Sequence, residues 1–168
     1  MLTKLIGGCI ILLGGTCLGF LKSSELSRRE KSLRDIKTAL SILESEIVFS
    51  SNHLKDAFLK ISRLCACRGL FSDAAKTMGD CGIDRAWQDA VEQNKKGLCL
   101  SESDAEILKI LSSRLGMSDK EQQKKNIRHV ETLLDMAITN AHAEYQNSAK
   151  LYRSMGFLGG LFVVMLLF

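Results

Sequence analysis

Proline is absent from this chain of 168 residues, and aromatic residues make up only 6% of it. Runs of alternating β-branched residues, which strands normally need, are missing as well. Leucine, alanine, lysine and glutamate are among the residues that dominate instead, and this composition favours helices. We therefore expect an all-α protein, built as an antiparallel helical bundle with a long helical stalk.

Concentrated charge of one sign is also missing. The formal net charge is +4 and the mean hydropathy is +0.05. All acidic residues, and every basic residue except Lys4, lie between Lys22 and Arg153, so this region has a formal charge of +3. Proteins that bind nucleic acid usually gather Lys and Arg on one face. We therefore expect no nucleic-acid partner.

Two apolar segments flank the charged region, and neither contains an ionisable side chain other than a thiol: Leu5–Leu21 and Met155–Phe168. As helices they would extend about 25 Å and about 21 Å, against a hydrocarbon core of about 30 Å. We predict an N-terminal transmembrane anchor over 1–22, a helical bundle domain over 23–154 and a C-terminal transmembrane segment over 155–168. A second segment that enters the membrane without crossing it remains an alternative.

Basic residues indicate how these segments are oriented. Lys4 before an apolar run is also typical of a cleaved signal peptide, but no A-x-A-like cleavage site follows, which favours a retained anchor. Basic residues are frequent on the inner side of both segments: Lys22, Arg28, Arg29, Lys31, Arg34, Lys150 and Arg153. The positive-inside rule then predicts that the middle region is cytoplasmic.

Each apolar segment carries a pair of glycines four residues apart: Gly15 and Gly19 in the first, Gly156 and Gly160 in the second. Counted from Lys22 and from Arg153, the two pairs lie at matching depths. Small residues let membrane helices approach closely. We predict that the two segments pack on each other as a hairpin. The alternative is that glycine is simply common in membrane helices.

The charged region opens with an amphipathic helical pattern. Ser24 or Ser27 predicts the start of a helix that continues to about Phe49. Its apolar residues recur at spacings of three and four: Leu33, Ile36, Leu40, Leu43 and Ile47. A turn is expected at 50–52.

Glycines predict the ends of four shorter helices. We expect one from Leu54 to Arg68–Gly69, one over 71–78 ended by Gly79, one between Gly82 and Gly97, and one from Ser101 to Gly116. A near-match to a capping box joins Ser101 to Asp104. The side chains expected to lie on the apolar faces of these helices are Leu54, Ala57, Phe58, Ile61, Ala86, Trp87, Ala90, Val91, Ile107, Leu108, Leu111 and Leu115.

Ser118 and Glu121 form a capping-box pattern that predicts the start of the last helix. We expect this helix to run unbroken into the C-terminal apolar segment, with a length of about 54 Å from Asp119 to Ser154. Its apolar face is expected to consist of Ile127, Val130, Leu134, Ala137, Ala141 and Tyr145. A helix this long needs a partner along its length. We expect it to lie antiparallel to the first helix as a stalk, with the shorter helices capping that pair.

The polar residues predict no catalytic, cofactor-binding or metal site. The glycines lie in the apolar ends or at helix ends, which excludes a phosphate-binding loop. The three histidines share neither a helix face nor the spacing of metal ligands: His53, His129 and His142. We consider one candidate partner surface, which is acidic and consists of Glu44, Glu46, Asp104 and Glu106.

The six cysteines are typical of free thiols in a reducing cytoplasm. Cys9 and Cys17 lie in the first apolar segment and have no cysteine partner in the second. A zinc site usually needs two pairs of closely spaced ligands, and this chain has at most one, Cys65 and Cys67. A hydrolase that uses these two cysteines is one functional alternative.

Several motifs, in order along nearly the whole chain, resemble the stage III sporulation protein AB family of spore-forming bacteria. They follow the glycine-containing N-terminal segment and are Leu33-Arg34, Ala39-Leu40-x-x-Leu43-Glu44-x-Glu46-Ile47, Leu54-Lys55-Asp56-Ala57-Phe58, Ala86-Trp87-x-x-Ala90, Asp104-x-Glu106-Ile107-Leu108, Leu115-Gly116-x-x-Asp119 and Lys150-x-Tyr152. One departure is His53, where the family often has proline.

The resemblance implies a non-enzymatic component of the channel-like complex that links mother cell and forespore during engulfment. It also implies a fold similar to the cytoplasmic domains of platform proteins in type II secretion and type IV pilus machines. The expected partners are a cytoplasmic secretion-type ATPase, other membrane subunits, and further copies of the chain. The family brings no catalytic or cofactor residues. A membrane-anchored helical sensor or regulatory binding module remains the alternative function.

Overall fold

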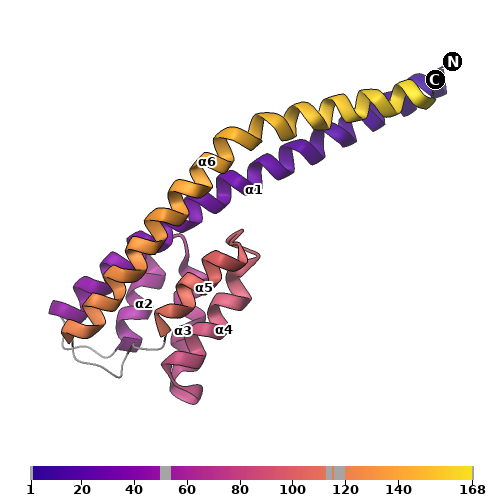
Figure 1. The fold of residues 1–168 in the computed structure, drawn as a ribbon. Coiled ribbons are helices and arrows are strands. Elements are labelled where there is room, and N and C mark those ends of the chain that lie inside the picture. Colours follow the sequence, from indigo (N-terminus) through magenta and orange to yellow (C-terminus); the bar gives the residue numbers. More distant parts are fainter. Residues whose placement is uncertain (1, 50–53, 113–114, 116–119, 168) are drawn as a thin grey trace. The chain divides into compact units, whose positions relative to one another are not determined.

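The computed structural model describes residues 2–49, 54–112, 115 and 120–167. Toward the ends of the long helices, the side chains of residues 2–6, 8–12, 48–49 and several from 153 onward lie outside this description. The described residues form α-helices and no strands, so the predicted all-α class is confirmed (Figure 1). The helices are α1 (Leu2–Phe49), α2 (Leu54–Leu64), α3 (Arg68–Cys81), α4 (Ile83–Lys95), α5 (Glu102–Ile110) and α6 (Lys120–Leu167).

The chain divides into two compact units. The first unit consists of Met1–Glu30 with Asn140–Phe168, and the second consists of Lys31–Thr139. Both long helices contribute to both units. The division differs from the predicted domain boundaries, because residues 23–30 and 140–154 belong with the apolar ends rather than with the middle of the chain.

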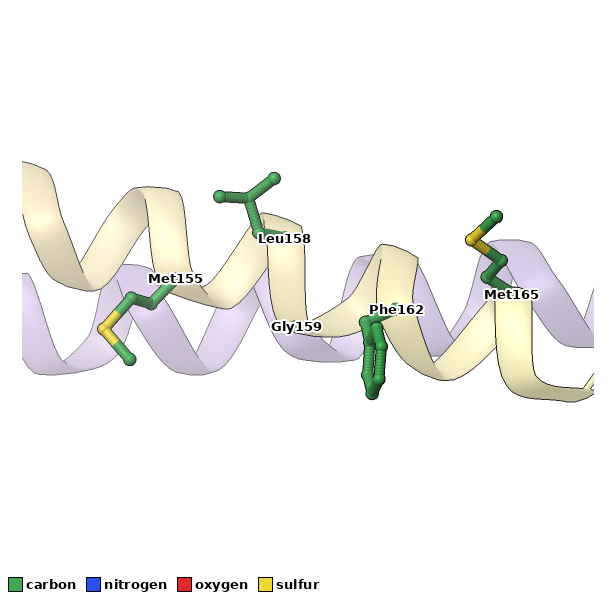
Figure 2. A pocket seen from close by; sticks show the side chains of 5 residues that line it. All are labelled: Met155, Leu158, Gly159, Phe162 and Met165. Atoms are coloured by element: carbon green, nitrogen blue, oxygen red, sulfur yellow. The ribbon is translucent and has the colours of Figure 1, made fainter.

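The first unit is a pair of antiparallel helices, formed by the beginning of α1 and the end of α6 (Figures 1 and 2). Arg29 donates to Glu144 over 2.7 Å, and His142 lies 3.1 Å from Glu30. The apolar and small side chains buried in this unit are Ser23, Leu26, Ala141 and Ala149. The expected pairing of the first and last helices is therefore present in this unit.

The start of α1 differs from the prediction. The helix begins at Leu2, so Ser24 and Ser27 lie inside it and cap nothing. The serines look like caps because they stand between an apolar and a charged stretch, but the helix continues unbroken through that boundary. The predicted turn at 50–52 and the predicted cap at Ser118 lie outside the described residues.

The core of the second unit confirms the predicted apolar faces of the long helices. The fully buried residues of α1 are Leu33, Ile36, Ala39, Leu40 and Leu43, and those of α6 are Ile127, Val130 and Leu134. Ile47 is only half-buried. Spacings of three and four place these side chains on one stripe of each helix, which is the arrangement that buries an apolar face.

An aromatic cluster joins the shorter helices. Phe58 of α2, Phe71 of α3 and Trp87 of α4 meet edge to face, with ring centroids 5.3 to 5.6 Å apart. Trp87 Nε1 donates over 2.7 Å to the carbonyl oxygen of Leu108 in α5. Aromatic pairs of this geometry add about 0.5–1.5 kcal/mol each beyond their buried area. The cluster thus fixes α2, α3, α4 and α5 relative to one another.

The ends of the short helices correct two predictions. The second helix ends at Leu64, and Arg68 and Gly69 instead begin α3. Gly79 does not end α3, which continues to Cys81. The real break is Gly82, whose φ of +80° suits glycine and disfavours other residues.

Gly69 is required by close packing between α3 and α4. A Cβ at this position would lie 2.5 Å from the side-chain oxygen of Asn94. The amide nitrogen of Asn94 donates to Asp73 and to the carbonyl oxygen of Ala90. That hydrogen bond also holds the pKa of Asp73 below its usual range, with Lys76 contributing next.

Two glycine substitutions in α3 should have effects of opposite sign. Gly69→Ala should lower the free energy of unfolding by about 1 kcal/mol, because displacing Asn94 sacrifices its two hydrogen bonds. Gly79→Ala is the matched control, since a Cβ there meets open space, and it should raise stability by up to about 1 kcal/mol. Urea unfolding of the full chain in detergent, followed by circular dichroism, measures both. Equal effects would contradict this account of Gly69.

Candidate functional site

The first unit exposes a large number of apolar side chains. Between 55% and 81% of each is exposed: Leu13, Leu18, Phe20 and Leu21 of α1, and Leu151, Met155, Leu158, Phe162 and Met165 of α6. Large apolar surfaces of this kind mark contacts with membranes or with other proteins. This surface therefore suits contact with a membrane or with another protein.

A shallow apolar hollow lies on α6 within this surface (Figure 2). It is lined by Met155, Leu158, Gly159, Phe162 and Met165. Gly159 leaves open space in this lining, because nothing lies within 4 Å of the position that a Cβ would take there. The lining residues that the structure describes carry no polar side chain, so this part of the hollow suits hydrocarbon rather than a polar ligand.

Among the residues whose side chains the structure describes, no helix contains an apolar stretch long enough to cross a membrane. The predicted anchors depend largely on residues outside that set, namely most of 2–12 and several from Gly156 onward. The two transmembrane helices therefore stay a prediction.

The glycine pairs are placed only in part. Gly19 is buried in the first unit and Gly15 is half-buried, while Gly14 is exposed. Gly156 and Gly160 lie within α6, but their burial is outside the described set. Packing through the two pairs stays a prediction.

Two of the predicted docking residues form ion pairs within the second unit. Glu44 of α1 accepts from Arg128 of α6 over 2.8 Å, and Glu46 of α1 accepts from Lys60 of α2 over 2.6 Å. Both glutamate side chains are largely covered, with 16% and 14% exposed. Their carboxylates hold helices together.

Asp104 is buried, although the sequence analysis placed it on the acidic surface. It is 1% exposed, and its carboxylate accepts from the backbone N–H of Ser101 over 2.9 Å. The Ser101 hydroxyl in turn accepts from the backbone N–H of Asp104, so the predicted capping box at the start of α5 is confirmed. An acidic residue at this position serves the helix end. Glu106 is exposed, and it pairs with Lys109 over 3.0 Å.

The structure thus does not bring the four acidic residues together as one free surface. The three ion pairs and the cap use all four carboxylates inside the second unit. Sequence reasoning placed them on a polar face, because charges off an apolar seam are usually solvated. Their partners on other helices could not be read from the local pattern.

The cysteines do not resemble a nucleophilic site. Burial raises the pKa of Cys67 to about 12, and it also raises the pKa of the half-buried Cys65. A thiol with a raised pKa is scarcely ionised near neutral pH, and the thiolate is the reactive form. In the described part of the chain, no three His, Cys, Asp or Glu side chains are placed to share a metal ion.

A polar groove lies between α1 and α6 in the second unit. Its walls are Arg34, Lys37, Thr38 and Ser41 of α1, and Glu131, Asp135 and Ile138 of α6. Lys37 donates to both carboxylate oxygens of Asp135, over 2.6 and 2.7 Å. Sequence reasoning did not single out Glu131, because its surroundings depend on α1, far away in the sequence.

Comparison with known proteins gives one consistent result. The model of the family described as stage III sporulation protein AB matches residues 4–168. The stage III sporulation protein AB of Bacillus subtilis (strain 168) is 29% identical over 168 residues, which cover 98% of each chain. A solved structure of a stage III sporulation protein AB matches with a TM-score of 0.65 and 27% identity, over 70% of this chain and 96% of that one.

Two acidic residues of α5 should differ sharply on substitution. Asp104→Ala should cost about 1–2 kcal/mol of unfolding free energy, because the capping box is lost. Glu106→Ala, the matched control, should change it by less than about 0.5 kcal/mol, since Glu106 is exposed. Urea unfolding of the full chain, followed by Trp87 fluorescence, measures both. A cost at Glu106 as large as that at Asp104 would contradict these assignments.

Proposed function

This chain belongs to the stage III sporulation protein AB family, and we propose that it is a membrane platform for other proteins of the sporulating cell. In this proposal it is not an enzyme. It couples a cytoplasmic ATPase to membrane subunits of a channel complex between mother cell and forespore. The membrane is that of the mother cell facing the forespore, and the second unit lies in the cytoplasm.

The apolar surface of the first unit is the main support for the proposed membrane location. Nine large apolar side chains are more than half exposed on the two antiparallel helix segments. Leaving such a surface in water is unfavourable, at about 25 cal/mol for each Å² of apolar area. A bilayer removes this penalty, and the sequence continues the apolar character toward both ends of the chain.

The platform part is supported by the way the second unit uses its charged residues. Ion pairs connect α1 to α6 and to α2, and Lys109 contacts Glu92 of α4 as well as Glu106 of α5. Single exposed pairs contribute little, but a network fixes the geometry of several helices together. A helical domain held in one shape suits the task of positioning other proteins.

Orientation follows from the basic residues next to the apolar segments. Their excess on the side of the second unit favours a cytoplasmic position for that unit. A cytoplasmic ATPase and the membrane subunits would then meet the same chain from two sides. Additional copies of this chain are also expected in such an assembly.

Charged substitutions should affect membrane association when they replace exposed apolar residues of the first unit, and not when they replace those of the second. Leu18→Glu combined with Phe162→Glu should strongly reduce the protein recovered in membranes, since an acidic residue at a helix centre costs about 2.5–3.5 kcal/mol in a bilayer. Met136→Glu with Ile110→Glu is the matched control, because these exposed side chains belong to the second unit. Flotation of cell membranes after an alkaline wash measures the effect. Full retention of the first double variant would contradict membrane insertion of this surface.

Affinity isolation tests the proposed partners. The tagged full chain, extracted from sporulating cells in mild detergent, should bring along a secretion-type ATPase and other membrane subunits of the channel complex. The Asp89→Asn variant, altered at an exposed residue of α4, should behave like the parent. Recovery of neither the ATPase nor any channel subunit would refute the platform role.

A further inference from the structure

The groove between α1 and α6 contains one carboxylate, Glu131, that belongs to no ion pair among the residues that the structure describes. Glu131 makes no hydrogen bond or ion pair with any residue that the structure describes. Four charged residues surround it: Glu44 and Lys37 of α1, and Arg128 and Asp135 of α6. Those four are already joined as two ion pairs, Glu44 with Arg128 and Lys37 with Asp135. Glu131 is the one charged residue of these five that belongs to neither pair.

This arrangement is unfavourable for the isolated protein. Partial burial is the largest cause that raises the pKa of Glu131 above its usual range, and repulsion from Glu44 is the next. The nearby cations Lys37 and Arg128 act in the opposite direction but do not prevail. A half-buried acid without a partner is a poor choice for stability alone, so the position suits a cation supplied by another molecule.

The walls of the groove indicate which cation fits. Thr38 and Ser41 bring hydroxyl oxygens from α1, and the Thr38 hydroxyl already donates to the Arg34 carbonyl, which leaves its oxygen free to accept. Ile138 supplies an apolar wall. A guanidinium offers five N–H donors in a planar fork, together with an apolar stem, and pairs with a carboxylate through two hydrogen bonds. Arg34 also lines the groove and has its own interactions.

We propose that this groove receives an arginine side chain from a protein partner, and that its guanidinium pairs with Glu131. The inference rests on the proposed platform function and specifies one contact through which a partner binds. The ionic pairs on either side keep the groove's shape, and Glu131 supplies the recognition.

The stability of the isolated protein gives the first test. Glu131→Gln should raise the melting temperature at pH 7 by about 1–3 °C, since it removes an uncompensated charge. The gain should shrink as the pH falls through the unfolded-state pKa and vanish near about pH 3, where the wild-type carboxyl is protonated in both folded and unfolded states. Asp135→Asn should instead lower the melting temperature at pH 7, because it leaves Lys37 without its partner. A loss of stability in Glu131→Gln would overturn the proposal.

Site-specific crosslinking in cells gives the second test. A photoreactive amino acid at Ser41 of the full chain should crosslink to a partner peptide that contains arginine. Glu131→Gln should reduce the yield about tenfold or more, as expected for the loss of a charged pair. Asp89→Asn should leave the yield unchanged. Exchanging the charges, with Glu131→Arg here and Arg→Glu in the mapped partner, should restore the crosslink.

The outcomes also separate this proposal from the platform function. A crosslink to lipid, a peptide without arginine, or a yield that ignores Glu131→Gln would refute the arginine contact, even if affinity isolation recovers the channel subunits. A crosslink that depends on Glu131 and joins a protein unrelated to the channel would keep the contact and refute the platform role.

Discussion

Antiparallel packing of α1 against α6 is the contact on which both units depend. Side-chain hydrogen bonds between the two helices join residues that are 84 to 115 positions apart in the sequence, from Glu44 with Arg128 to Arg29 with Glu144. Bringing such distant segments together costs chain entropy before any contact repays it. The shorter helices and their aromatic cluster reduce that cost, because they keep the intervening chain compact. Without the long pair, neither the apolar surface of the first unit nor the groove of the second would exist.

The sequence predicted the apolar faces of the helices well, because burial repeats with the helical period and leaves a local trace. Trp87 and Leu134 illustrate this, and so does the cap at Ser101. Predictions that depend on side-chain contacts with a second helix were less accurate. Glu44 is an acidic residue off the apolar seam, and no local pattern shows that it meets Arg128 of α6. The local pattern did join Asp104 to the cap at Ser101, but it gave no sign that the Asp104 side chain is buried. Glycine was ambiguous for a similar reason. Gly79 and Gly82 look alike in sequence, but only Gly82 has a left-handed backbone conformation.

The two units meet different demands with the same kind of secondary structure. In the first, large apolar side chains point outward and small ones are buried, as expected where the surroundings are apolar and close helix approach is the stabilising factor. In the second, large apolar side chains are buried and charges lie outside, as in a protein surrounded by water. The proposed membrane platform would connect two such environments. No catalytic residue is needed for that role.

The aromatic residues are distributed so that each unit can be observed separately. The only tryptophan of the chain, Trp87, is fully buried in the second unit, where its ring meets Phe58 and Phe71. Both tyrosines, Tyr145 and Tyr152, belong to the first unit. Light that excites tryptophan selectively therefore reports the folding of the second unit alone, while tyrosine absorbance follows the helix pair of the first. The unmodified protein thus carries one spectroscopic label for each half of its structure.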